Sequence, residues 1–355
     1  MLIRAFLLSL LLLVLSYADQ IKLISKKLPV GYIDFYPLKD YLVLKVEYRG
    51  DNFFVVVNPD TLNTKVYNVL EYPRGAYQID SKVYGTSSNR NRFCVYELIP
   101  DFKQVLCLDI AYIEKELLKA KKYRETLVYQ SSILEDGNLA FLLSPRKPHN
   151  ITEFLFGGKE YLGVFVVLDF NKKVLLNKKL NTEYKSTTLT SKGVLYIKNN
   201  KLYLLDSKGK TYLISQQDKF KSIQKSQNFI IVKGKNSSYV FYEGSLFLLN
   251  SNCNVKEDLV FCNQQNKLDI FSLKKKEKIF SLRKGNDFYQ FLCKSGKYFI
   301  FSKDFYSFLF FDKNGNLVDK FTPEDKHLYI DCIKGILTVK KEKYLKLFKI
   351  KDSGQ

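Results

Sequence analysis

Histidine and tryptophan are scarce in this 355-residue chain, which has two His residues and no Trp. His149 and His327 are far apart in the sequence, so a multi-histidine metal centre is excluded within one chain and a histidine-based catalytic triad has little support. No glycine-rich phosphate loop and no nucleophile elbow are present. The common residue patterns of nucleotide-dependent and hydrolytic enzymes are therefore missing.

Arginine is also scarce, although the net charge is +21. Only eight of the 57 basic residues are Arg, and the lysines are spread over nearly every turn. A strongly positive field attracts anionic partners such as lipid headgroups, acidic glycans or nucleic acid. Bidentate reading of phosphates and bases prefers Arg, so we expect a diffuse, solvated lysine surface, with a dedicated anion site as the alternative, and no specific nucleic-acid recognition.

Long apolar runs are absent except at the N-terminus. Residues 1–18 carry one early cation, Arg4, then an apolar core from Ala5 to Leu15 and small residues at a cleavage position. This pattern predicts a secretory signal peptide and export to a periplasmic or extracellular location. The alternative is an uncleaved N-terminal membrane anchor. In the mature chain, residues 19–355, we expect no transmembrane span.

A short pattern fills the rest of the chain: an apolar strand, a turn with Asp, Asn or Gly, and a second apolar strand. It is clearest in LYLLDSKGK (Leu202–Lys210) and FLFFDKNGN (Phe308–Asn316). Asp and Asn cap such turns through their side chains, and Gly supplies positive φ. A second pattern recurs between these copies: a short segment, a polar turn and an apolar strand. Together the two patterns make eight four-stranded units, spaced about 30 to 56 residues apart. This predicts an all-β fold, a single β-propeller of eight blades, with seven as the alternative.

The two ends of the chain predict how the ring closes. The last unit ends at YLKLFKIKDSGQ and has no outer strand, whereas the mature chain begins with a lone strand, Leu23–Leu28. That segment, LISKKL, resembles the outer strand LLNKKL at Leu175–Leu180. We therefore expect Leu23–Leu28 to pair with Tyr344–Ile350, which leaves no open seam between first and last blades. The domain 19–355 is expected to be a monomer.

Two segments depart from the repeat. Residues 111–125, AYIEKELLKAKKYRE, are rich in Glu, Lys, Leu and Ala and predict a short helical insertion. Residues 144–163 form a long loop, and long insertions on a rigid scaffold are common sites of function.

Six cysteines follow the signal peptide, so disulfides are permitted. Cys94 and Cys107 flank the turn at Pro100-Asp101 symmetrically, which would place them opposite each other; unpaired buried cysteines are the alternative. Bridges Cys253–Cys262 and Cys293–Cys332 are possible, because three of these residues occupy matching positions in successive units. No CxxC spacing supports a metal site, and we expect no metal ion and no cofactor.

A propeller brings its inner strands together around a central channel, which is where a binding site is expected. Several polar or aromatic residues lie on the predicted inner strands, with Thr188 and Gln224 as further members. The main candidates are Tyr32, Asp34, Tyr77, Asp80, Tyr129, Gln130 and Asp331. They could bind a cation or a polar ligand, or they could only satisfy backbone groups.

The repeated LYLLDSKGK and FLFFDKNGN segments resemble quinoprotein-type (PQQ-like) or WD40-like propeller repeats. Families of this kind include periplasmic quinone-dependent dehydrogenases and eight-bladed scaffold subunits of outer-membrane protein assembly. The dehydrogenase blades rely on docked Trp residues, which this chain lacks. The scaffold resemblance fits the export signal and the blade count, although the chain has no Cys for lipid attachment after the apolar core.

Three functional hypotheses follow. The first is an exported, non-catalytic scaffold that binds a protein partner or an anionic envelope component. The alternative is a hydrolase or lyase that acts on a polymer through the channel carboxylates Asp34, Asp80 or Asp331. The third is electrostatic binding of anionic polymers.

Overall fold

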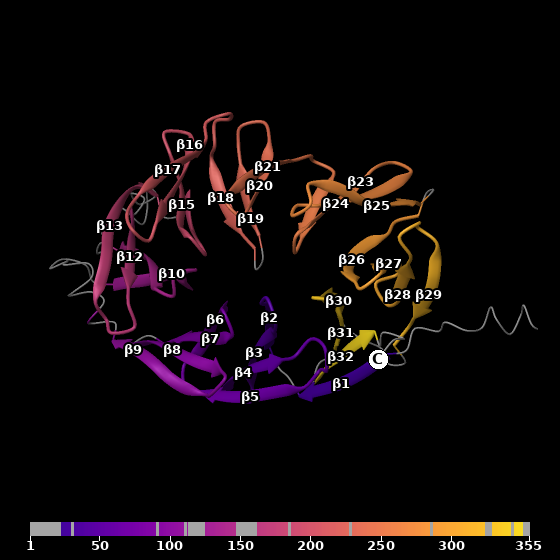
Figure 1. Ribbon diagram of the computed structural model, residues 1–355, viewed down its shortest axis with the longest axis horizontal. Coiled ribbons are helices and arrows are strands. Elements are labelled where there is room, and N and C mark those ends of the chain that lie inside the picture. Colours follow the sequence, from indigo (N-terminus) through magenta and orange to yellow (C-terminus); the bar gives the residue numbers. More distant parts are fainter. Residues whose placement is uncertain are drawn as a thin grey trace, which may run out of the picture.

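The computed structural model describes residues 23–29, 32–89, 92–109, 112, 125–146, 162–183, 186–226, 229–284, 287–323, 329–341 and 344–350. These residues form eight four-stranded antiparallel sheets. Figure 1 shows the sheets arranged in a ring, with strands such as β2, β6, β10 and β30 facing the middle and β1 and β5 on the outside. The protein is therefore an eight-bladed β-propeller, as the sequence predicts, and the seven-bladed alternative is wrong.

Each blade is a meander of four strands in chain order, except the last. Blade 1 comprises β2 (Tyr32–Pro37), β3 (Leu42–Tyr48), β4 (Asp51–Val57) and β5 (Thr64–Val69), and blade 2 comprises β6 (Tyr72–Ile79), β7 (Lys82–Ser88), β8 (Arg92–Ile99) and β9 (Lys103–Asp109). Blade 3 comprises β10 (Glu125–Ile133), β11 (Leu139–Arg146), β12 (Leu162–Leu168) and β13 (Val174–Glu183), and blade 4 comprises β14 (Thr187–Thr190), β15 (Gly193–Lys198), β16 (Lys201–Asp206) and β17 (Thr211–Ser215). Blade 5 comprises β18 (Ser222–Lys225), β19 (Ile230–Lys233), β20 (Ser238–Tyr242) and β21 (Ser245–Leu249), and blade 6 comprises β22 (Cys253–Lys256), β23 (Leu259–Asn263), β24 (Lys267–Ser272) and β25 (Glu277–Arg283). Blade 7 comprises β26 (Gln290–Ser295), β27 (Tyr298–Ser302), β28 (Phe308–Phe311) and β29 (Leu317–Phe321). Blade 8 comprises β30 (Tyr329–Ile333), β31 (Ile336–Lys340) and β32 (Tyr344–Ile350), and its outer strand is β1 (Leu23–Pro29) from the other end of the chain.

The ring closes as predicted from the two ends of the chain. Strand β1 pairs antiparallel with β32, in a register that runs from Leu23 opposite Ile350 to Pro29 opposite Tyr344. Leu28 and Leu345 face each other in this pair, and both are buried. The N-terminal strand thus completes the last blade.

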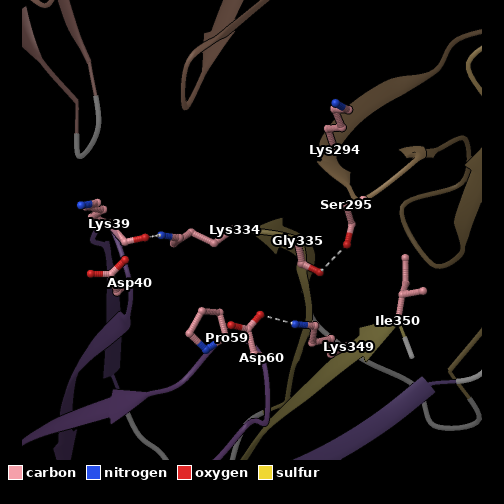
Figure 2. Close-up of a pocket in the computed structure, with 11 residues that line it drawn as sticks. Lys39, Asp40, Pro59, Asp60, Lys294, Ser295, Lys334, Gly335, Lys349 and Ile350 are labelled. Atoms are coloured by element: carbon pink, nitrogen blue, oxygen red, sulfur yellow. Dashed lines mark hydrogen bonds and ion pairs between the residues drawn. The ribbon is translucent and has the colours of Figure 1, made fainter. Parts of the chain in front are cut away.

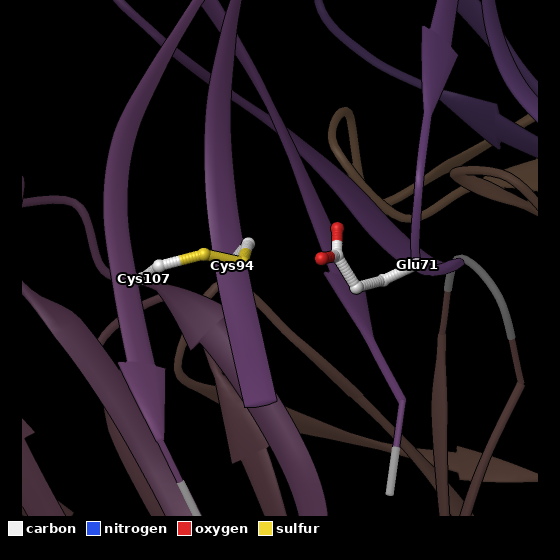
Figure 3. Close-up of side chains that lie close together, drawn as sticks. All are labelled: Glu71, Cys94 and Cys107. Atoms are coloured by element: carbon white, nitrogen blue, oxygen red, sulfur yellow. A yellow bond between two sulfur atoms is a disulfide. The ribbon is translucent and has the colours of Figure 1, made fainter. Parts of the chain in front are cut away.

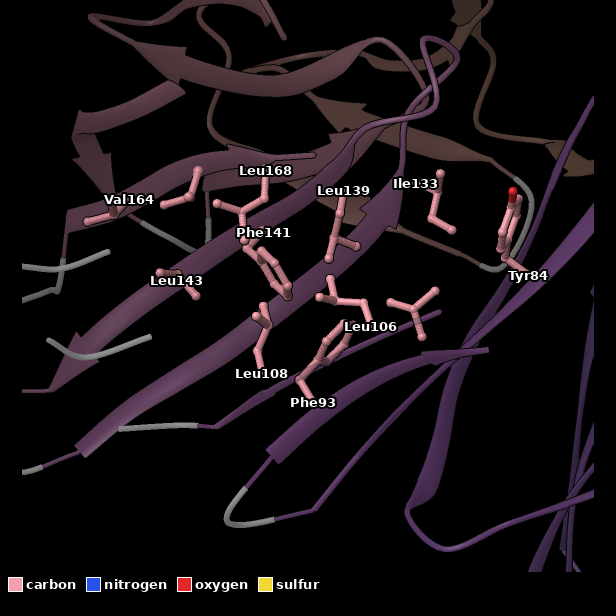
Figure 4. Close-up of a cluster of buried hydrophobic side chains, with 12 residues drawn as sticks. Tyr84, Phe93, Leu106, Leu108, Ile133, Leu139, Phe141, Leu143, Val164 and Leu168 are labelled. Carbon is pink, nitrogen blue, oxygen red and sulfur yellow. The ribbon is translucent and has the colours of Figure 1, made fainter. Parts of the chain in front are cut away.

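The hydrophobic core lies between the blades. Because successive side chains of a strand point to opposite faces, a middle strand of a blade packs against both neighbours. In β4, Phe54 and Val56 join the cluster shared with blade 2, while Val55 and Val57 join the cluster shared with blade 8. Figure 4 shows one such cluster, where Phe93 of blade 2 packs edge-to-face on Phe141 of blade 3. The described residues form eight clusters of this kind, one for each junction of the ring.

The repeated turn has one structure in blades 4 and 7. In blade 4 the Asp206 carboxylate accepts hydrogen bonds from the backbone of Lys208 at 3.0 Å and Lys210 at 2.8 Å, and Gly209 has a φ of 86°. Asp312 and Gly315 repeat this arrangement in blade 7. The side-chain cap and the left-handed glycine explain why the Asp-x-x-Gly spacing marks these turns.

Several sequence predictions fall on residues that the structure does not describe. The signal peptide, residues 1–18, lies outside the described residues. In the helical insertion 111–125 only Tyr112, which is helical, and Glu125, the first residue of β10, are described. The ends of the loop 144–163 belong to β11 and β12, and residues 147–161 are not described. Within the described ranges, no helical segment has the length and apolar character needed to cross a bilayer.

Candidate functional site

The innermost strands of the eight blades are β2, β6, β10, β14, β18, β22, β26 and β30. The turns between first and second strands and between third and fourth strands lie on one face of the ring, which we call the turn face. The loops between second and third strands and the blade-to-blade connections lie on the opposite face, which we call the connection face. This division follows from the antiparallel meander of each blade.

Most of the predicted channel residues do lie on innermost strands. Tyr32 is in β2 and Tyr129 is in β10, but their side chains are outside the described part of the structure. Asp80 is not on an inner strand: it is an exposed residue of the turn after β6, with a φ of 51°. The strand β6 ends at Ile79 because this tight turn begins directly after it.

Two of the predicted residues join neighbouring blades. The Tyr77 hydroxyl donates a hydrogen bond of 2.5 Å to the carbonyl of Ser131, which links blade 2 to blade 3. Burial raises the pKa of Tyr77 to about 12, so the hydroxyl keeps its proton at neutral pH. The amide oxygen of Gln130 accepts hydrogen bonds from Thr188 and Leu189, which links blade 3 to blade 4. The Tyr77 hydroxyl and the Gln130 amide oxygen therefore form hydrogen bonds between neighbouring blades.

The predicted carboxylates Asp34 and Asp331 each form an ion pair. Lys45 lies 3.0 Å from Asp34, and its ammonium also sits 4.0 Å from the centre of the Tyr72 ring. Asp331 pairs with Lys256 across two blades. The two carboxylates thus lie on the innermost strands of neighbouring blades, and each has its own cation.

Tyr329 extends the Asp331 pair. Its hydroxyl donates to Asp331 at 3.1 Å, and partial desolvation by the surrounding protein together with the carboxylate raises the pKa of Tyr329 to about 12. The ring of Tyr329 is 52% exposed at the start of β30. This group of Lys256, Asp331 and Tyr329 is polar and charge-balanced.

Lys225 is a site residue that the sequence analysis missed. Its ammonium donates a 2.8 Å hydrogen bond to the carbonyl of Leu189, which links blade 5 to blade 4. The side chain is accessible to solvent, but protein surrounds it inside the ring, and this desolvation lowers its pKa to about 8. In the sequence, Lys225 directly follows Gln224 on a predicted inner strand, and this position was the available signal. Because lysine is abundant throughout the chain, the position did not single out Lys225.

A pocket of about 420 Å³ opens on the turn face where blades 7, 8 and 1 meet. We call it the closure pocket, because it lies at the end of the blade that β1 completes. Figure 2 shows its charged lining. The charged residues are Lys39, Lys294, Lys334, Lys349, Asp40 and Asp60. The sequence analysis did not identify this site, since its residues come from both ends of the chain.

The turn at Lys334 and Gly335 holds the closure pocket together. The Lys334 ammonium donates to the carbonyls of Leu38 and Lys39 in blade 1, the latter at 2.5 Å. The Lys334 backbone N–H donates to Glu257 of blade 6 at 2.6 Å. The Ser295 hydroxyl of blade 7 donates to the Gly335 carbonyl at 3.2 Å, as Figure 2 shows. One turn of blade 8 therefore contacts three other blades.

Charge pairing within the closure pocket is uneven. Lys349 pairs with Asp60 at 2.7 Å, and Asp40 accepts a hydrogen bond from Gln78 of blade 2. Burial lowers the pKa of Lys334, because desolvation disfavours its ammonium form. With four lysines and two aspartates, the lining carries net positive charge.

The three predicted disulfides are all present. Cys94–Cys107 joins β8 to β9 within blade 2, and Cys253–Cys262 joins β22 to β23 within blade 6. Cys293–Cys332 joins the innermost strands of blades 7 and 8. The alternative of unpaired buried cysteines is wrong for these residues.

A buried carboxylate, Glu71, points toward the first of these disulfides (Figure 3). Both sulfurs are bonded to each other, so they offer no thiolate to a metal ion. Glu71 is instead neutralised by Arg92, 2.6 Å away, and accepts a 2.7 Å hydrogen bond from Tyr96. Burial and this carboxylate raise the pKa of Tyr96 to about 12. The cluster is a structural element of blade 2.

No family model matches the chain, and no curated protein matches its sequence. Three solved structures are similar to this chain over nearly their whole length, although the sequence identity is low. BamB from Moraxella catarrhalis is 10% identical, with a TM-score of 0.46, and the match covers 94% of this chain and 99% of that one. The C-terminal WD40 domain of Sif2 is 9% identical, with a TM-score of 0.46 and coverage of 94% and 100%. The computationally designed Ika8 protein is 12% identical, with a TM-score of 0.44 and coverage of 90% and 98%.

Proposed function

We propose that this protein is an exported, non-catalytic β-propeller that acts as an interaction scaffold for a protein of the cell envelope. Three disulfides support export, because such bonds form and persist in oxidising compartments. The N-terminal segment 1–18 has the composition of a secretory signal. A ring of eight similar sheets is a rigid platform on which loops can present binding residues.

The observation that carries this proposal is a group of exposed aromatic side chains on the connection face of blade 7. Phe288, Phe305 and Tyr306 are 58%, 57% and 58% exposed. The ion pair of Lys303 with Asp287, 2.9 Å long, holds together the two loops that carry them. Exposed aromatic residues are enriched where proteins bind proteins, and charged residues commonly form the rim of such surfaces.

Capture from an envelope extract, followed by reconstitution with the purified partner, tests the proposal. The wild-type protein is expected to retain one envelope protein in stoichiometric amount, and the purified pair is expected to form a complex. A Phe288→Ser/Phe305→Asn variant is expected to bind at least tenfold more weakly, since a few aromatic anchors carry most of the energy of an interface. Asn suits position 305 because its φ is 63°.

The matched control removes two exposed apolar side chains elsewhere. Leu213 and Leu248, on the outermost strands of blades 4 and 5, are 50% and 64% exposed. A Leu213→Ser/Leu248→Ser variant should bind the partner as the wild type does. Failure to recover any stoichiometric partner, or equal weakening in both variants, would count against the scaffold role at this surface.

The alternative of a polymer hydrolase or lyase stays a prediction. Asp34 and Asp331 are each paired with a lysine, and Asp80 lies in an exposed turn. Screening on glycans and peptides with Asp→Asn variants at these three positions separates it from the scaffold proposal: activity lost in one variant would favour the enzyme.

A further inference from the structure

Lys225 is a cation inside the ring that has no counter-charge among the described residues. Its side chain is accessible to solvent while protein surrounds it, so the ammonium borders a solvent-filled space within the ring. Desolvation is the single cause that lowers its pKa, and no described carboxylate pairs with it or acts on it. Lys334 differs, because three carboxylates act on it. A positive charge left in such a place favours the binding of an anion.

Leu189 of β14 brings Gln130 close to Lys225. The Leu189 backbone N–H donates to the Gln130 amide oxygen at 2.7 Å, and its carbonyl accepts a hydrogen bond from the Lys225 ammonium at 2.8 Å. The N–H and C=O of one strand residue point to the same edge, which for Leu189 is the inner edge, away from β15. Side chains from blades 3 and 5 therefore meet at one residue of blade 4.

Both side chains have hydrogen-bond donors left for a ligand. An ammonium group has three N–H donors, and the Leu189 carbonyl takes one of those of Lys225. Leu189 and Thr188 both donate to Gln130, which fixes its amide oxygen toward them and leaves its NH2 group on the other branch. No described residue accepts a hydrogen bond from that NH2 group. The two donor groups are thus held in place before a ligand binds.

The donors and the charge narrow the class of ligand. One lysine and one neutral amide balance a single negative charge, whereas a phosphate group carries nearly two negative charges at neutral pH. A carboxylate spreads one charge over two oxygens and accepts two hydrogen bonds side by side. The Lys225 ammonium and the Gln130 NH2 group offer one donor to each of these oxygens.

We propose that Lys225 and the amide nitrogen of Gln130 bind one carboxylate group inside the ring. One carboxylate oxygen accepts a hydrogen bond from the ammonium, and the other accepts one from the NH2 group. The carboxylate belongs either to a free small acid or to the C-terminus of a peptide, and both share this chemistry. The site lies on the innermost strands, away from the aromatic group of blade 7, so it does not depend on the proposed partner.

Saturation-transfer NMR titrations of the full mature chain test the site with three probes: acetate, N-acetyl-Ala-Ala-Ala and the C-terminal amide of that peptide. Sodium chloride keeps the ionic strength constant, so that binding is measured against chloride. We expect at least one of the two carboxylates to bind. Tighter binding of the peptide than of acetate identifies a chain end as the source, and equal or weaker binding identifies a small acid. The peptide amide should show no binding, because it lacks the charge.

Two variants with the same change of charge make the test specific. Gln130→Glu keeps an acceptor oxygen for Leu189 and Thr188, but it places a second carboxylate oxygen beside Lys225 in place of the NH2 group. This variant should weaken binding by about tenfold or more, because it supplies the counter-charge itself and loses one donor group. Gln217→Glu makes the same change in an exposed loop and should leave binding unchanged. Both variants should keep the wild-type melting temperature.

Trace acylation of the wild-type chain with acetic anhydride, followed by peptide mapping, locates the site without any substitution. The better carboxylate probe, at about twice its dissociation constant, should slow the acylation of Lys225 about threefold by mass action. The exposed Lys221, directly before β18, should react at an unchanged rate. No binding of either carboxylate, equal binding of the peptide amide, equal weakening in the two variants, or no protection of Lys225 would overturn the proposal.

Discussion

Gln130 of blade 3 and Thr188 of blade 4 are joined by a hydrogen bond of 3.0 Å, in which the Thr188 hydroxyl donates to the Gln130 amide oxygen. The same oxygen accepts the Leu189 backbone N–H at 2.7 Å. Tyr77 and Lys225 make comparable contacts to the neighbouring blades. Polar residues of the innermost strands thus fasten one blade to the next, while the hydrophobic clusters fill the space between the sheets.

Replacement of Gln130 by Ala should destabilise the protein by about 1–3 kcal/mol, because it leaves the partly buried donors of Thr188 and Leu189 without their acceptor. Chemical denaturation followed by tyrosine fluorescence measures this change. Gln217→Ala, in an exposed loop, is the control and should alter the free energy of unfolding by less than about 0.5 kcal/mol. Equal effects of the two substitutions would show that Gln130 is no link between blades.

Alkaline pH should destabilise the fold through its tyrosines. The pKa values of Tyr77, Tyr96, Tyr242 and Tyr329 are all raised to about 12, mainly by burial. A raised folded-state pKa gives stability that is complete below pH 10, the pKa of an unfolded tyrosine, and is lost as pH rises to 12. The melting temperature should therefore fall steeply between pH 10 and 12.

Tyr77→Phe isolates one of these contributions. At pH 7 the variant should be less stable than the wild type by about 1 kcal/mol, because the Ser131 carbonyl loses its donor. As pH rises from 10 to 12 the difference should shrink, since phenylalanine has no proton to lose. A constant difference over this range would contradict a raised pKa at Tyr77.

The three disulfides should contribute unequally to stability. In the loop-entropy description, a bridge between residues 39 apart is worth about 4 kcal/mol, and one between residues 9 apart about 2.6 kcal/mol. Cys293→Ser/Cys332→Ser should therefore lower the midpoint of denaturation more than Cys253→Ser/Cys262→Ser. The reverse order would show that the covalent link between blades 7 and 8 is not the more important constraint.

The fold could be predicted from the sequence because its signals are local. Turns such as Asp206 to Gly209 mark where strands end, and runs such as Phe54 to Val57 mark strands buried on both faces. The ring closure could be predicted because the last repeat unit lacks an outer strand, whereas the N-terminal part of the chain has one strand that belongs to no unit of its own. The Cys94–Cys107 disulfide could be predicted because the two residues flank one turn symmetrically, and Cys293–Cys332 because matching positions on the innermost strands of successive blades lie side by side.

The site was less predictable because its contacts are long-range. Lys334 meets the carbonyl of Lys39, 295 residues away in sequence, and Lys256 meets Asp331, 75 residues away. No local pattern encodes either contact. Strand assignment placed Asp34, Tyr77 and Gln130 on inner strands correctly, but it could not show which neighbour each side chain would bind.

Ring closure by the N-terminal strand is tested most directly by disulfide trapping. Lys27 of β1 lies directly opposite Lys346 of β32, and directly opposite Cβ atoms in an antiparallel pair are about 4.5–5.5 Å apart. Peptide mapping of oxidised Lys27→Cys/Lys346→Cys should find a disulfide between positions 27 and 346 and none in Lys27→Cys/Lys201→Cys, whose second site is in blade 4. Free thiols at positions 27 and 346, with the native bridges intact, would contradict a ring closed by β1.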